Sequence, residues 1–544
     1  MDIEDTPLLP GQTINRNDVC KKPVTPLVLP RKNRKKQDIV GYDIPGTQTI
    51  YVKTYGCSHN SSDSEYMIGQ LVNYGYGITE NFQDADCYLL NSCTVKNPSE
   101  THLLNEIDKA KLTGKPVIVS GCVPQGQPKS ENWDGLSVIG VQQIDRVVEV
   151  VEESLRGNTV RFMGRSKKSL PALDLPKVRR NPFIEILPVN VGCLNQCTYC
   201  KTKHARGELV SWPVEQLVSR ALAAAKEGVR EIRLTSEDTA AYGRDIGTNI
   251  VVLLNALLDA LPSHVMLRVG MTNPPYVMEH IDALCKIFQR DNVYAFLHIP
   301  IQSASDNVLA SMKREYTKAD FCRLVDALLQ RVPGMTIATD IICGFPTETD
   351  DDFEQTLELV RQYKFPVINI SQFYPRPGTP AAQMKQLRTQ VKKQRSRAIT
   401  KVFLSYEPHQ HLVGTEHRVI ITERAHDKKS WVGHTRNFVQ VLVPEDQGEF
   451  GADVWVKIVK ATKFAVFGEV LTERDQSVHA VPVDTVLTAP KSNASSTDDS
   501  VDDNSTAAKV SSSSSLHLPL PLLGLALLLA FLALRFGIAT LKSA

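Results

Sequence analysis

The sequence predicts an α/β protein built from an open α/β domain, a partial (β/α)6 barrel, a small β-barrel and a C-terminal transmembrane helix. Six strand-like runs within residues 180–407 alternate with apolar residues at helical spacing, which predicts a parallel sheet of βα units. Alternating runs within residues 411–473 predict short strands joined by turns. A charge-free apolar stretch near the C-terminus is long enough to cross a bilayer.

Residues 1–47 predict a disordered, basic N-terminal tail. They contain the basic cluster Arg31, Lys32, Arg34, Lys35 and Lys36. Such a run is more typical of a solvated tail than of an RNA-binding arm or a nuclear signal. The chain of 544 residues has a net charge of only +2, so any nucleic-acid surface must be local.

Residues 48–157 predict the open α/β domain, because strand and helix signals alternate there. Three cysteines in this region each follow an apolar, β-branched run: Cys57, Cys93 and Cys122, called here the upstream cysteines. Strand ends of an open α/β sheet meet at one crevice, so these thiols are expected around one metal site. The alternative is that they are buried core cysteines, as free Cys often is. The threefold repeat of the pattern favours the metal site.

Residues 180–407 predict the partial barrel, and Cys193, Cys197 and Cys200 directly follow its first strand-like run. This C-x-x-x-C-x-x-C triplet, called here the cysteine triplet, lies where such barrels carry reactive residues. Three thiolates at this spacing bind three irons of a 4Fe–4S cluster and leave the fourth iron open. Structural zinc is the alternative, but it usually takes four ligands in two short pairs, and only His204 is nearby.

Disulfides are not expected. The chain has eleven cysteines and no N-terminal apolar segment, which indicates a reducing, cytosolic location.

Residues 411–473 predict a small antiparallel β-barrel, a form that often binds oligonucleotides. Four residues are candidates for a stacking and phosphate-binding face: Trp431, His434, Arg436 and Phe438. The alternative is that some of them fill the core of the barrel.

The C-terminal region predicts a flexible linker followed by a membrane anchor. Residues 474–515 are rich in Ser, Asp, Thr and Asn. Residues 516–538 form the candidate transmembrane helix, with no charge from Leu516 to Leu534. A single span this close to the C-terminus predicts a tail anchor that leaves the preceding domains in the cytosol.

The cysteine triplet after the first strand of a six-fold βα barrel resembles the radical S-adenosylmethionine (SAM) enzymes. The upstream motifs TYGCSHN, NSCTV and SGC and the small β domain make the chain similar to the methylthiotransferase family, over residues of about 48–473. That family has an N-terminal cluster domain, a radical SAM core and a TRAM domain. The motifs GCLNQCTYCKTKHARG and TSEDTAAYG, with the tail anchor, resemble the eukaryotic branch that modifies threonylcarbamoyladenosine in tRNA.

The resemblance implies an enzyme that adds a methylthio group to carbon 2 of this nucleoside, next to the anticodon. The cysteine triplet would hold the radical cluster that binds S-adenosylmethionine, and the upstream cysteines would hold an auxiliary cluster that carries the sulfur. Other readings stay open at this point. They are an isopentenyladenosine tRNA or a ribosomal protein as substrate, a non-catalytic iron–sulfur electron carrier, and a zinc-bearing RNA-binding adaptor.

The resemblance also implies a set of residues that bind S-adenosylmethionine from loops after the strands: Ser236, Glu237, Gln302, Ser303, Arg314 and Gly344. Glu237 would contact the amino group of the cofactor. Arg314 would pair with its carboxylate, although a surface ion pair is the alternative. Thr347 replaces a family glycine in the turn GFPTET, and Thr disfavours a positive φ there.

The expected partners are tRNA, a membrane and an unidentified electron donor, and the protein is expected to be a monomer. The stretch Ala381–Lys401 predicts a helix with seven unopposed bases, which favours contact with phosphates: Lys385, Arg388, Lys392, Lys393, Arg395, Arg397 and Lys401. The resemblance favours the endoplasmic reticulum membrane, with the catalytic domains facing the cytosol. The basic residues after the span keep the mitochondrial outer membrane as the alternative.

Overall fold

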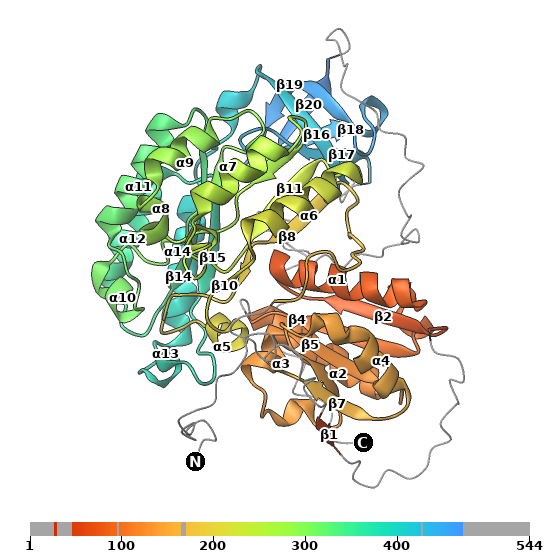
Figure 1. Cartoon of the computed structure of the whole chain (residues 1–544). Coiled ribbons are helices and arrows are strands. Elements are labelled where there is room, and N and C mark those ends of the chain that lie inside the picture. Colours follow the sequence, from red (N-terminus) through yellow and green to blue (C-terminus); the bar gives the residue numbers. More distant parts are fainter. Residues whose placement is uncertain (1–26, 30–45, 95–96, 165–169, 426–427, 472–544) are drawn as a thin grey trace, which may run out of the picture. The chain divides into compact units, whose positions relative to one another are not determined.

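The computed structural model describes residues 27–29, 46–94, 97–164, 170–425 and 428–471 (Figure 1). The predicted linker 474–515 and transmembrane helix 516–538 lie outside these residues, as does nearly all of the predicted tail 1–47. Within the described ranges, no helix is long and apolar enough to cross a bilayer.

The first unit is a seven-stranded sheet with the strand order β1-β7-β6-β5-β4-β2-β3 (Figure 1). Neighbouring strands are parallel except β1 and β7, which pair antiparallel. The sheet has the open α/β architecture that was predicted, but it extends beyond residues 48–157. Strand β1 lies within the predicted disordered tail 1–47 and pairs with β7, so that prediction is wrong for Leu27–Leu29. The strands are β1 (Leu27–Leu29), β2 (Thr49–Thr54), β3 (Gly77–Thr79), β4 (Cys87–Ser92), β5 (Val117–Gly121), β6 (Ser137–Ile139) and β7 (Thr159–Phe162).

Four helices connect these strands: α1 (Ser58–Tyr74), α2 (Asn97–Lys111), α3 (Cys122–Gly126) and α4 (Val147–Leu155). Strand β4 is buried at every position, as a central parallel strand covered on both faces must be. Helix α1 also contacts the second unit, where the Ser62 hydroxyl donates to the carbonyl oxygen of Ile186 at 3.2 Å. The first and second units are therefore packed together along α1.

The second unit contains two three-stranded parallel sheets, β12-β11-β8 and β13-β14-β15. A single parallel bridge between Leu267 and Val293 joins them, so the strands follow the order β8-β11-β12-β13-β14-β15. This arrangement confirms six βα units. The strands are β8 (Ile184–Pro188), β11 (Glu231–Thr235), β12 (Met266–Arg268), β13 (Phe296–His298), β14 (Thr336–Cys343) and β15 (Val367–Gln372), with the short pair β9 (Asn190–Val191) and β10 (Val210–Ser211) beside them.

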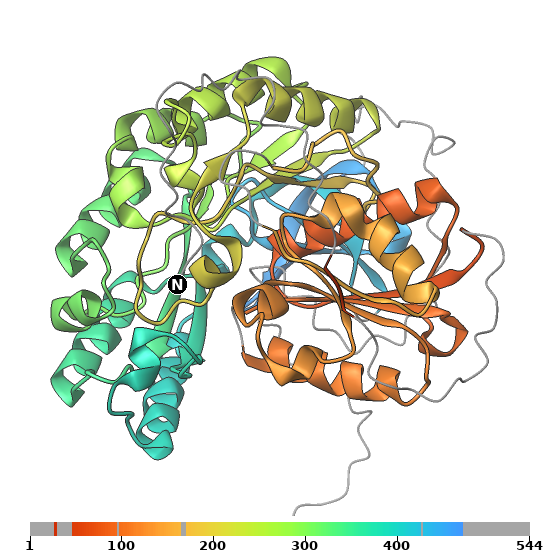
Figure 2. The ribbon, with the colours of Figure 1, turned by 60° about the horizontal axis from the view of Figure 1, so that its bottom comes forward.

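Helices line the outer side of these strands (Figure 2). Two begin with a capping box, in which Thr317 pairs with Asp320 and Thr349 pairs with Asp352. The helices are α5 (Thr202–Arg206), α6 (Val214–Lys226), α7 (Ile250–Ala260), α8 (Pro274–Met278), α9 (Ile281–Phe288), α10 (Asp306–Ser311), α11 (Lys318–Arg331), α12 (Asp350–Tyr363), α13 (Pro380–Gln383) and α14 (Thr389–Leu404).

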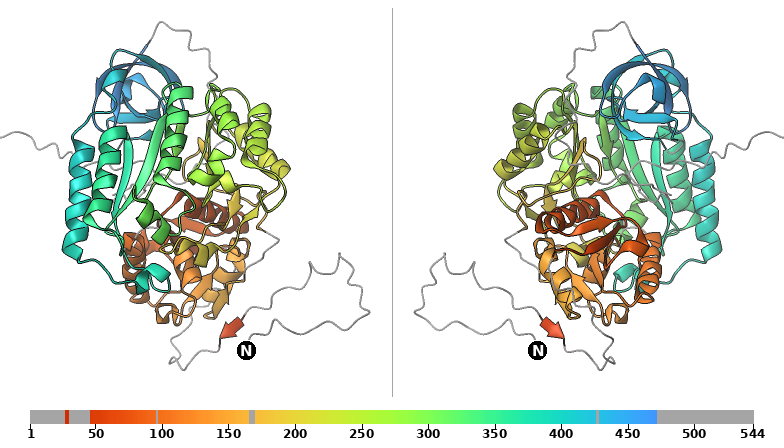
Figure 3. Two further views of the ribbon diagram at one scale, coloured as in Figure 1. Left: turned by 90° about the vertical axis from the view of Figure 1, so that its left-hand side faces the viewer. Right: turned by 90° about the vertical axis from the view of Figure 1, so that its right-hand side faces the viewer.

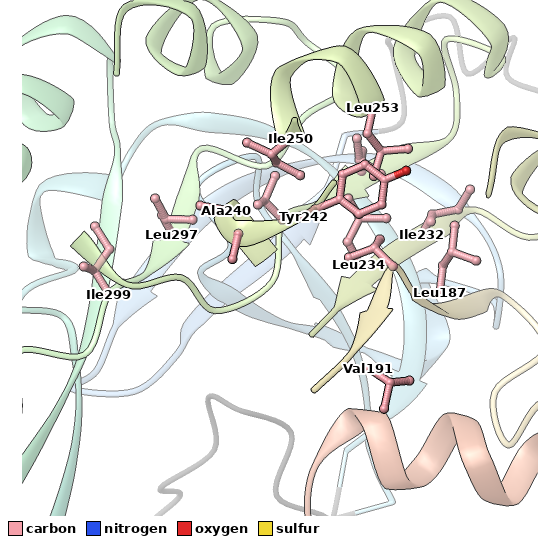
Figure 4. Packing of buried hydrophobic residues seen from close by; sticks show 14 of the residues in the cluster. Leu187, Val191, Ile232, Leu234, Ala240, Tyr242, Ile250, Leu253, Leu297 and Ile299 are labelled. Atoms are coloured by element: carbon pink, nitrogen blue, oxygen red, sulfur yellow. The ribbon is translucent and has the colours of Figure 1, made fainter. Parts of the chain in front are cut away.

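The core of the second unit lies between its strands and the surrounding helices. Leu187, Ile232 and Leu234 extend from neighbouring strands toward Tyr242 and Leu253, and all five are buried (Figure 4). Burying each large aliphatic side chain stabilises the fold by about 1.5–3 kcal/mol. This core fixes the strand ends that carry the candidate site.

The third unit is a closed five-stranded barrel with the order β16-β17-β18-β20-β19 (Figure 3). Strands β18 and β20 pair in parallel, so the prediction of a purely antiparallel barrel is wrong for this one pair. Closing the barrel places the last strand beside β18 with the same direction. The strands are β16 (Glu416–Arg424), β17 (Ser430–His434), β18 (Gln440–Pro444), β19 (Asp453–Ala461) and β20 (Val466–Val470).

Candidate active site

The upstream cysteines lie at the carboxyl ends of three neighbouring strands, as the sequence predicts. Cys57 is the N-cap of α1, Cys93 directly follows β4, and Cys122 is the first residue of α3. The strands β2, β4 and β5 are adjacent in the sheet. A negative charge on Cys57 helps to raise the pKa of Cys122, because these two sulfurs lie near each other.

Two glycines allow the loops that carry these cysteines to approach closely. Gly56 has a φ of +107°, and a Cβ there would lie 1.9 Å from Cβ of Cys93. Gly121 has a φ of +92°, and a Cβ there would lie 2.3 Å from the carbonyl oxygen of Ser92. A larger residue at either position would push the strand ends apart, so both glycines are needed to bring the thiols together.

The chemistry of this donor set fits an iron–sulfur cluster. Cys93 and Cys122 are buried and Cys57 is half-buried. Burial raises the pKa of the Cys122 thiol to about 12, and the Arg206 guanidinium partly offsets this increase. A soft metal binds the thiolate and displaces its proton, which overcomes the cost that burial imposes. Three sulfur donors close to a guanidinium thus suit a metal group with thiolate ligands.

The cysteine triplet lies in a loop that follows β9. This loop leaves the strand through Gly192, whose φ is +86° and where a Cβ would lie 2.0 Å from the carbonyl oxygen of Glu208. Within the loop, the amide of Cys200 donates to the carbonyl oxygen of Cys197 at 3.1 Å. The amide of Thr198 donates to the carbonyl oxygen of Met312 at 3.0 Å. These bonds fold the loop back on itself and attach it to the barrel.

All three cysteines of the triplet are half-buried. Burial raises the pKa of the Cys193 thiol above its usual range, and Asp238 adds to this effect. In the described ranges, no three His, Cys, Asp or Glu side chains converge on a point as the ligands of one metal ion. In a 4Fe–4S cluster each thiolate binds a different iron, so its ligands are spread over the faces of the cluster.

Arg314 lies directly beside the triplet. Its Nη1 donates to Sγ of Cys197 at 3.2 Å, its Nη2 donates to Oδ1 of Asn273, and its Nε donates to the Tyr316 hydroxyl at 3.0 Å. These three partners are a thiol, an amide and a phenol. None of them is a carboxylate, as the partner in the alternative surface ion pair would be. The predicted pairing with a cofactor carboxylate stays a prediction, and the guanidinium that would form it lies next to Cys197.

Asp238 also lies beside the triplet, although it was not among the predicted site residues. Its Oδ1 accepts from the Thr272 hydroxyl and from the amide of Asn273, both at 3.2 Å, and its Oδ2 accepts from Nδ2 of Asn273 at 2.6 Å. Burial raises the pKa of Asp238 to about 6, and the bonds from Asn273 oppose that increase. The available signal was its place in the same loop as Glu237, one residue further on.

The two predicted residues just before Asp238 have different surroundings. The Ser236 hydroxyl donates to Oδ1 of Asn190 at 2.6 Å and accepts from the amide of Asp238 at 2.8 Å. Glu237 lies 3.1 Å from Nε of Arg206 and 3.4 Å from Nδ1 of His59. Burial raises the pKa of Glu237 to about 7, and a charge on Cys57 adds to the increase. Glu237 therefore lies next to the upstream cysteines.

Gln302 and Ser303 follow β13 and are both buried. Gln302 has a φ of +67°, which is unusual for a residue other than glycine. Its backbone is held there by a bond to the carbonyl oxygen of Asp340 at 2.8 Å and by a bond from the amide of Ile342 at 2.9 Å. Strain of this kind is often found at ligand sites, and the role of Gln302 in cofactor binding stays a prediction.

The turn GFPTET accommodates its threonine without strain. Thr347 is exposed and is not among the residues with positive φ. The glycine that needs a positive φ is Gly344, at +79°. Its amide donates to Oε2 of Glu348 at 2.7 Å, so the backbone of this turn is already paired within the protein.

Three family models match the chain in the order that the sequence predicts. Residues 49–134 match an uncharacterized protein family, UPF0004, residues 187–360 match the radical SAM superfamily, and residues 410–471 match the TRAM domain. The threonylcarbamoyladenosine tRNA methylthiotransferase of Xenopus laevis is 55% identical over 86% of this chain and 86% of its own length. The chain belongs to the radical SAM methylthiotransferase family.

Other relatives agree. The threonylcarbamoyladenosine tRNA methylthiotransferase of Homo sapiens is 57% identical over 79% of this chain and 75% of its own length. A probable enzyme of the same name from Pyrococcus horikoshii is 36% identical over 78% of this chain and 99% of its own length. This radical SAM methylthiotransferase is accordingly an enzyme whose family uses a 4Fe–4S cluster and S-adenosylmethionine.

In this radical SAM methylthiotransferase, most of the predicted RNA-binding face on the β-barrel faces the barrel of the second unit. Phe438 packs against Tyr294 and Phe296, with ring centroids 4.9 and 5.0 Å apart. The ring of His434 stacks on Phe438 at 4.2 Å. Arg436 donates to the carbonyl oxygen of Phe288 at 2.6 Å. These three residues dock the TRAM domain, so their assignment to an RNA-binding face is wrong.

Trp431 is the exception. It is partly exposed and stacks on Phe450 at 6.0 Å between ring centroids, with the guanidinium of Arg424 5.6 Å from its ring.

The basic stretch Ala381–Lys401 is not one helix. It contains the end of α13 and most of α14, separated by residues 384–388. Two of its seven bases point inward: Lys392 donates to the carbonyl oxygen of Phe373, and Arg395 pairs with Glu348 at 2.7 Å. The prediction of seven unopposed bases is therefore wrong for these two. The exposed ones are Lys385, Arg388, Lys393, Arg397 and Lys401.

Three further cysteines pack in or against the core of the second unit. Cys285 and Cys343 are buried within the main hydrophobic core, and Cys322 lies partly buried against it. They are thus distinct from the two cysteine sets of the candidate site.

Proposed function

We propose that this enzyme adds a methylthio group to carbon 2 of threonylcarbamoyladenosine, next to the anticodon of tRNA, and that it uses two 4Fe–4S clusters. The observation that carries the proposal is the placement of two separate cysteine triads. The upstream cysteines lie at the carboxyl ends of neighbouring parallel strands, and the triplet lies in the loop after β9, which directly follows the first barrel strand, β8. The substrate is supported by the relatives from Xenopus laevis and Homo sapiens, which are threonylcarbamoyladenosine tRNA methylthiotransferases. When bound, the clusters and S-adenosylmethionine supply radical chemistry at carbon 2 and the sulfur to be inserted.

The upstream cysteines and the cysteine triplet hold one cluster each in this proposal. Three ligands on each cluster leave one iron open to a substrate or to a sulfur donor. The glycines at positions 56, 121 and 192 allow the loops to pack tightly enough to present these thiols. The sulfur ligands of each set can thus come near one another, because these turns carry no Cβ that would keep the loops apart.

The residues beside the triplet are arranged to receive the amino acid part of S-adenosylmethionine. Arg314 carries a positive charge that suits a carboxylate, and Asp238 carries a negative charge that suits an ammonium. Asn273 lies between them, since it bonds to both side chains. We propose Asp238, in place of Glu237, as the acidic partner of the cofactor, because Glu237 already pairs with Arg206.

The exposed bases of α14 and of the turn before it are the proposed tRNA surface. Lys385, Arg388, Lys393, Arg397 and Lys401 lie on the solvent side, and the inward bases Lys392 and Arg395 attach the helix to the barrel. Unopposed bases on one face attract phosphates by releasing condensed counterions. Trp431 adds a ring on which an unpaired base can stack.

We further propose that the protein is a monomer anchored by residues 516–538 in the endoplasmic reticulum membrane, with its domains in the cytosol. The apolar composition of these residues supports the anchor. Cell fractionation of the full chain against a chain ending at residue 473 tests the anchor. A full chain that remains in the soluble fraction would contradict it.

Mass spectrometry of tRNA nucleosides tests the reaction and the substrate together. Cells that lack the protein should lose 2-methylthio-threonylcarbamoyladenosine and accumulate the unmodified precursor. Wild type should restore the product, whereas Cys197→Ala and Cys122→Ala should not, because each removes one ligand from one cysteine set. A loss confined to methylthiolated isopentenyladenosine, or to a modified ribosomal protein, would contradict the proposed substrate.

A further inference from the structure

Arg206 connects the two cysteine sets, although it belongs to neither. It is the last residue of α5, six positions after Cys200, and it is only 1% exposed. Its Nε donates to Sγ of Cys122 at 3.3 Å, across a sequence separation of 84 residues. The guanidinium of the second unit therefore reaches a cysteine of the first unit.

The remaining partners of Arg206 hold it in this position. Its Nη2 donates to Oδ1 of Asn60 and to Oδ2 of Asp63, both at 2.7 Å, and Glu237 lies 3.1 Å from its Nε. Both Asn60 and Asp63 belong to α1, the helix that Cys57 caps. Oδ1 of Asn60 also lies 3.6 Å from Sγ of Cys122. One guanidinium thus bonds the helix after Cys57 and the thiol of Cys122 at the same time.

A structural ion pair alone does not account for this arrangement. Two carboxylates already balance the charge of one guanidinium, and burying a guanidinium is costly. A neutral thiol is a weak acceptor, whereas a thiolate bound to a metal accepts a strong, charge-assisted hydrogen bond. The hydrogen bond from Nε to Cys122 therefore reaches its full strength only when that sulfur is a thiolate bound to a metal.

We propose that Arg206 is a positioning residue for the auxiliary cluster, which orients the Cys122 thiolate and raises the reduction potential of that cluster. The inference rests on the proposed function, since it takes the upstream cysteines as cluster ligands. Hydrogen bonds to ligand sulfurs and nearby charge set the potentials of iron–sulfur clusters. A cation held against one sulfur stabilises the reduced, more negative state.

The experiment isolates the auxiliary cluster in the full chain. A parent variant carries Cys193→Ala, Cys197→Ala and Cys200→Ala, so that only the upstream cysteines can bind a cluster. Arg206→Gln and Arg206→Lys are each added to this parent. After anaerobic reconstitution, iron and sulfide per chain, the rate of iron loss to a chelator, and the midpoint potential from a titration followed by electron paramagnetic resonance are measured.

Arg206→Gln should shift the midpoint potential to more negative values and speed iron loss several-fold. In Arg206→Lys the midpoint potential should lie between those of the parent and of Arg206→Gln. Lysine keeps the positive charge but lacks the forked guanidinium that donates to both Asn60 and Cys122. Arg395→Gln is the matched control: it removes another buried, ion-paired arginine, and its partners Glu348 and Asp350 lie away from both cysteine sets. The control should leave the potential and iron retention at the parent values.

The outcomes separate the two proposals. A parent that binds no cluster would overturn the two-cluster function and this inference with it. A parent that binds a cluster whose potential and retention are unchanged by Arg206→Gln would overturn the role of Arg206 alone. If Arg206→Gln does not fold, Arg206→Lys decides, because unchanged values in that variant would also overturn the inference.

Discussion

Nη1 of Arg314 donates a hydrogen bond to Sγ of Cys197 at 3.2 Å, so a guanidinium contacts the middle cysteine of the triplet. Arg206 makes the equivalent contact with Cys122 at 3.3 Å. Each cysteine set therefore has one arginine aimed at one of its sulfurs. In neither case is the arginine near its cysteine in the sequence, since 117 and 84 residues separate the pairs.

Arg314→Gln should weaken the binding of S-adenosylmethionine to the reconstituted enzyme. A hydrogen bond to a charged group contributes about 1.5–3 kcal/mol, which corresponds to roughly 10–100-fold in the dissociation constant. Equilibrium binding measured anaerobically checks this. Arg244→Gln, which removes an exposed arginine paired with Glu279, serves as the control and should bind the cofactor normally. If Arg314→Gln binds S-adenosylmethionine with wild-type affinity, Arg314 does not contribute to the cofactor site.

Glu185→Gln should destabilise the contact between the first and second units. Glu185 is fully buried and pairs with Lys177 at 2.9 Å, Arg220 at 3.1 Å and Arg179. Lys177 also pairs with Glu65 of α1 at 3.2 Å, which links this cluster to the first unit. Removing one partner of a buried ion pair typically costs about 3–5 kcal/mol. Thermal unfolding at neutral pH measures this, with the exposed Glu279→Gln expected to cost at most about 1 kcal/mol. Equal Tm values for the two variants would contradict the prediction.

The same carboxylate predicts a dependence of stability on pH. Burial raises the pKa of Glu185, but Lys177, Arg179 and Arg220 more than offset this and hold it at about 2, below the usual 4.5. The folded pKa is depressed, so the stabilisation is fully present above about 4.5 and is lost as the pH falls from there toward 2. Wild type should lose Tm more steeply over this window than Glu185→Gln does. Parallel curves would show that Glu185 does not titrate in this way.

Reversing three exposed bases of α14, with Lys393→Glu, Arg397→Glu and Lys401→Glu, should weaken tRNA binding and flatten its salt dependence. Each lost phosphate contact lowers the salt slope by about 0.7–0.9, so three contacts lower it by roughly two units. Filter binding over a range of salt concentrations measures the slope, and iron content checks that the clusters remain. A control with the same change in net charge reverses three scattered exposed lysines: Lys111, Lys226 and Lys286. An equal loss of affinity in both variants would point to net charge alone.

Phe438→Ala should loosen the TRAM domain from the second unit. The ring contacts Tyr294, Phe296 and His434, and truncating a buried Phe typically costs about 3–5 kcal/mol. Thermal unfolding should show a lower Tm, and limited proteolysis should cleave faster near residue 410. Phe450→Ala, at a ring that is 41% exposed, should have a much smaller effect. An unchanged Tm with reduced tRNA affinity would contradict this prediction and would indicate that Phe438 contacts RNA.

The sequence by itself determined the order of the units and the two cysteine sets. The triplet lies within eight residues, and each upstream cysteine follows a strand-like run by a few residues, so both signals are local. The tertiary structure decided which polar side chains serve these sets. Arg206 reaches Cys122, Glu237 turns toward the upstream cysteines and Asp238 toward the triplet, through contacts between residues distant in the chain.

Only the tertiary structure separated buried bases from exposed ones. Arg395 and Arg397 are both basic and lie on the same helix, yet Arg395 pairs with Glu348 inside the protein and Arg397 faces solvent. Likewise Phe438 is an aromatic residue of the β-barrel, but the surface that it packs against belongs to the second unit. Composition and spacing describe what a side chain is able to bind. The packing of distant segments determines which partner it meets, because burial and charge pairing depend on neighbours that the local sequence does not contain.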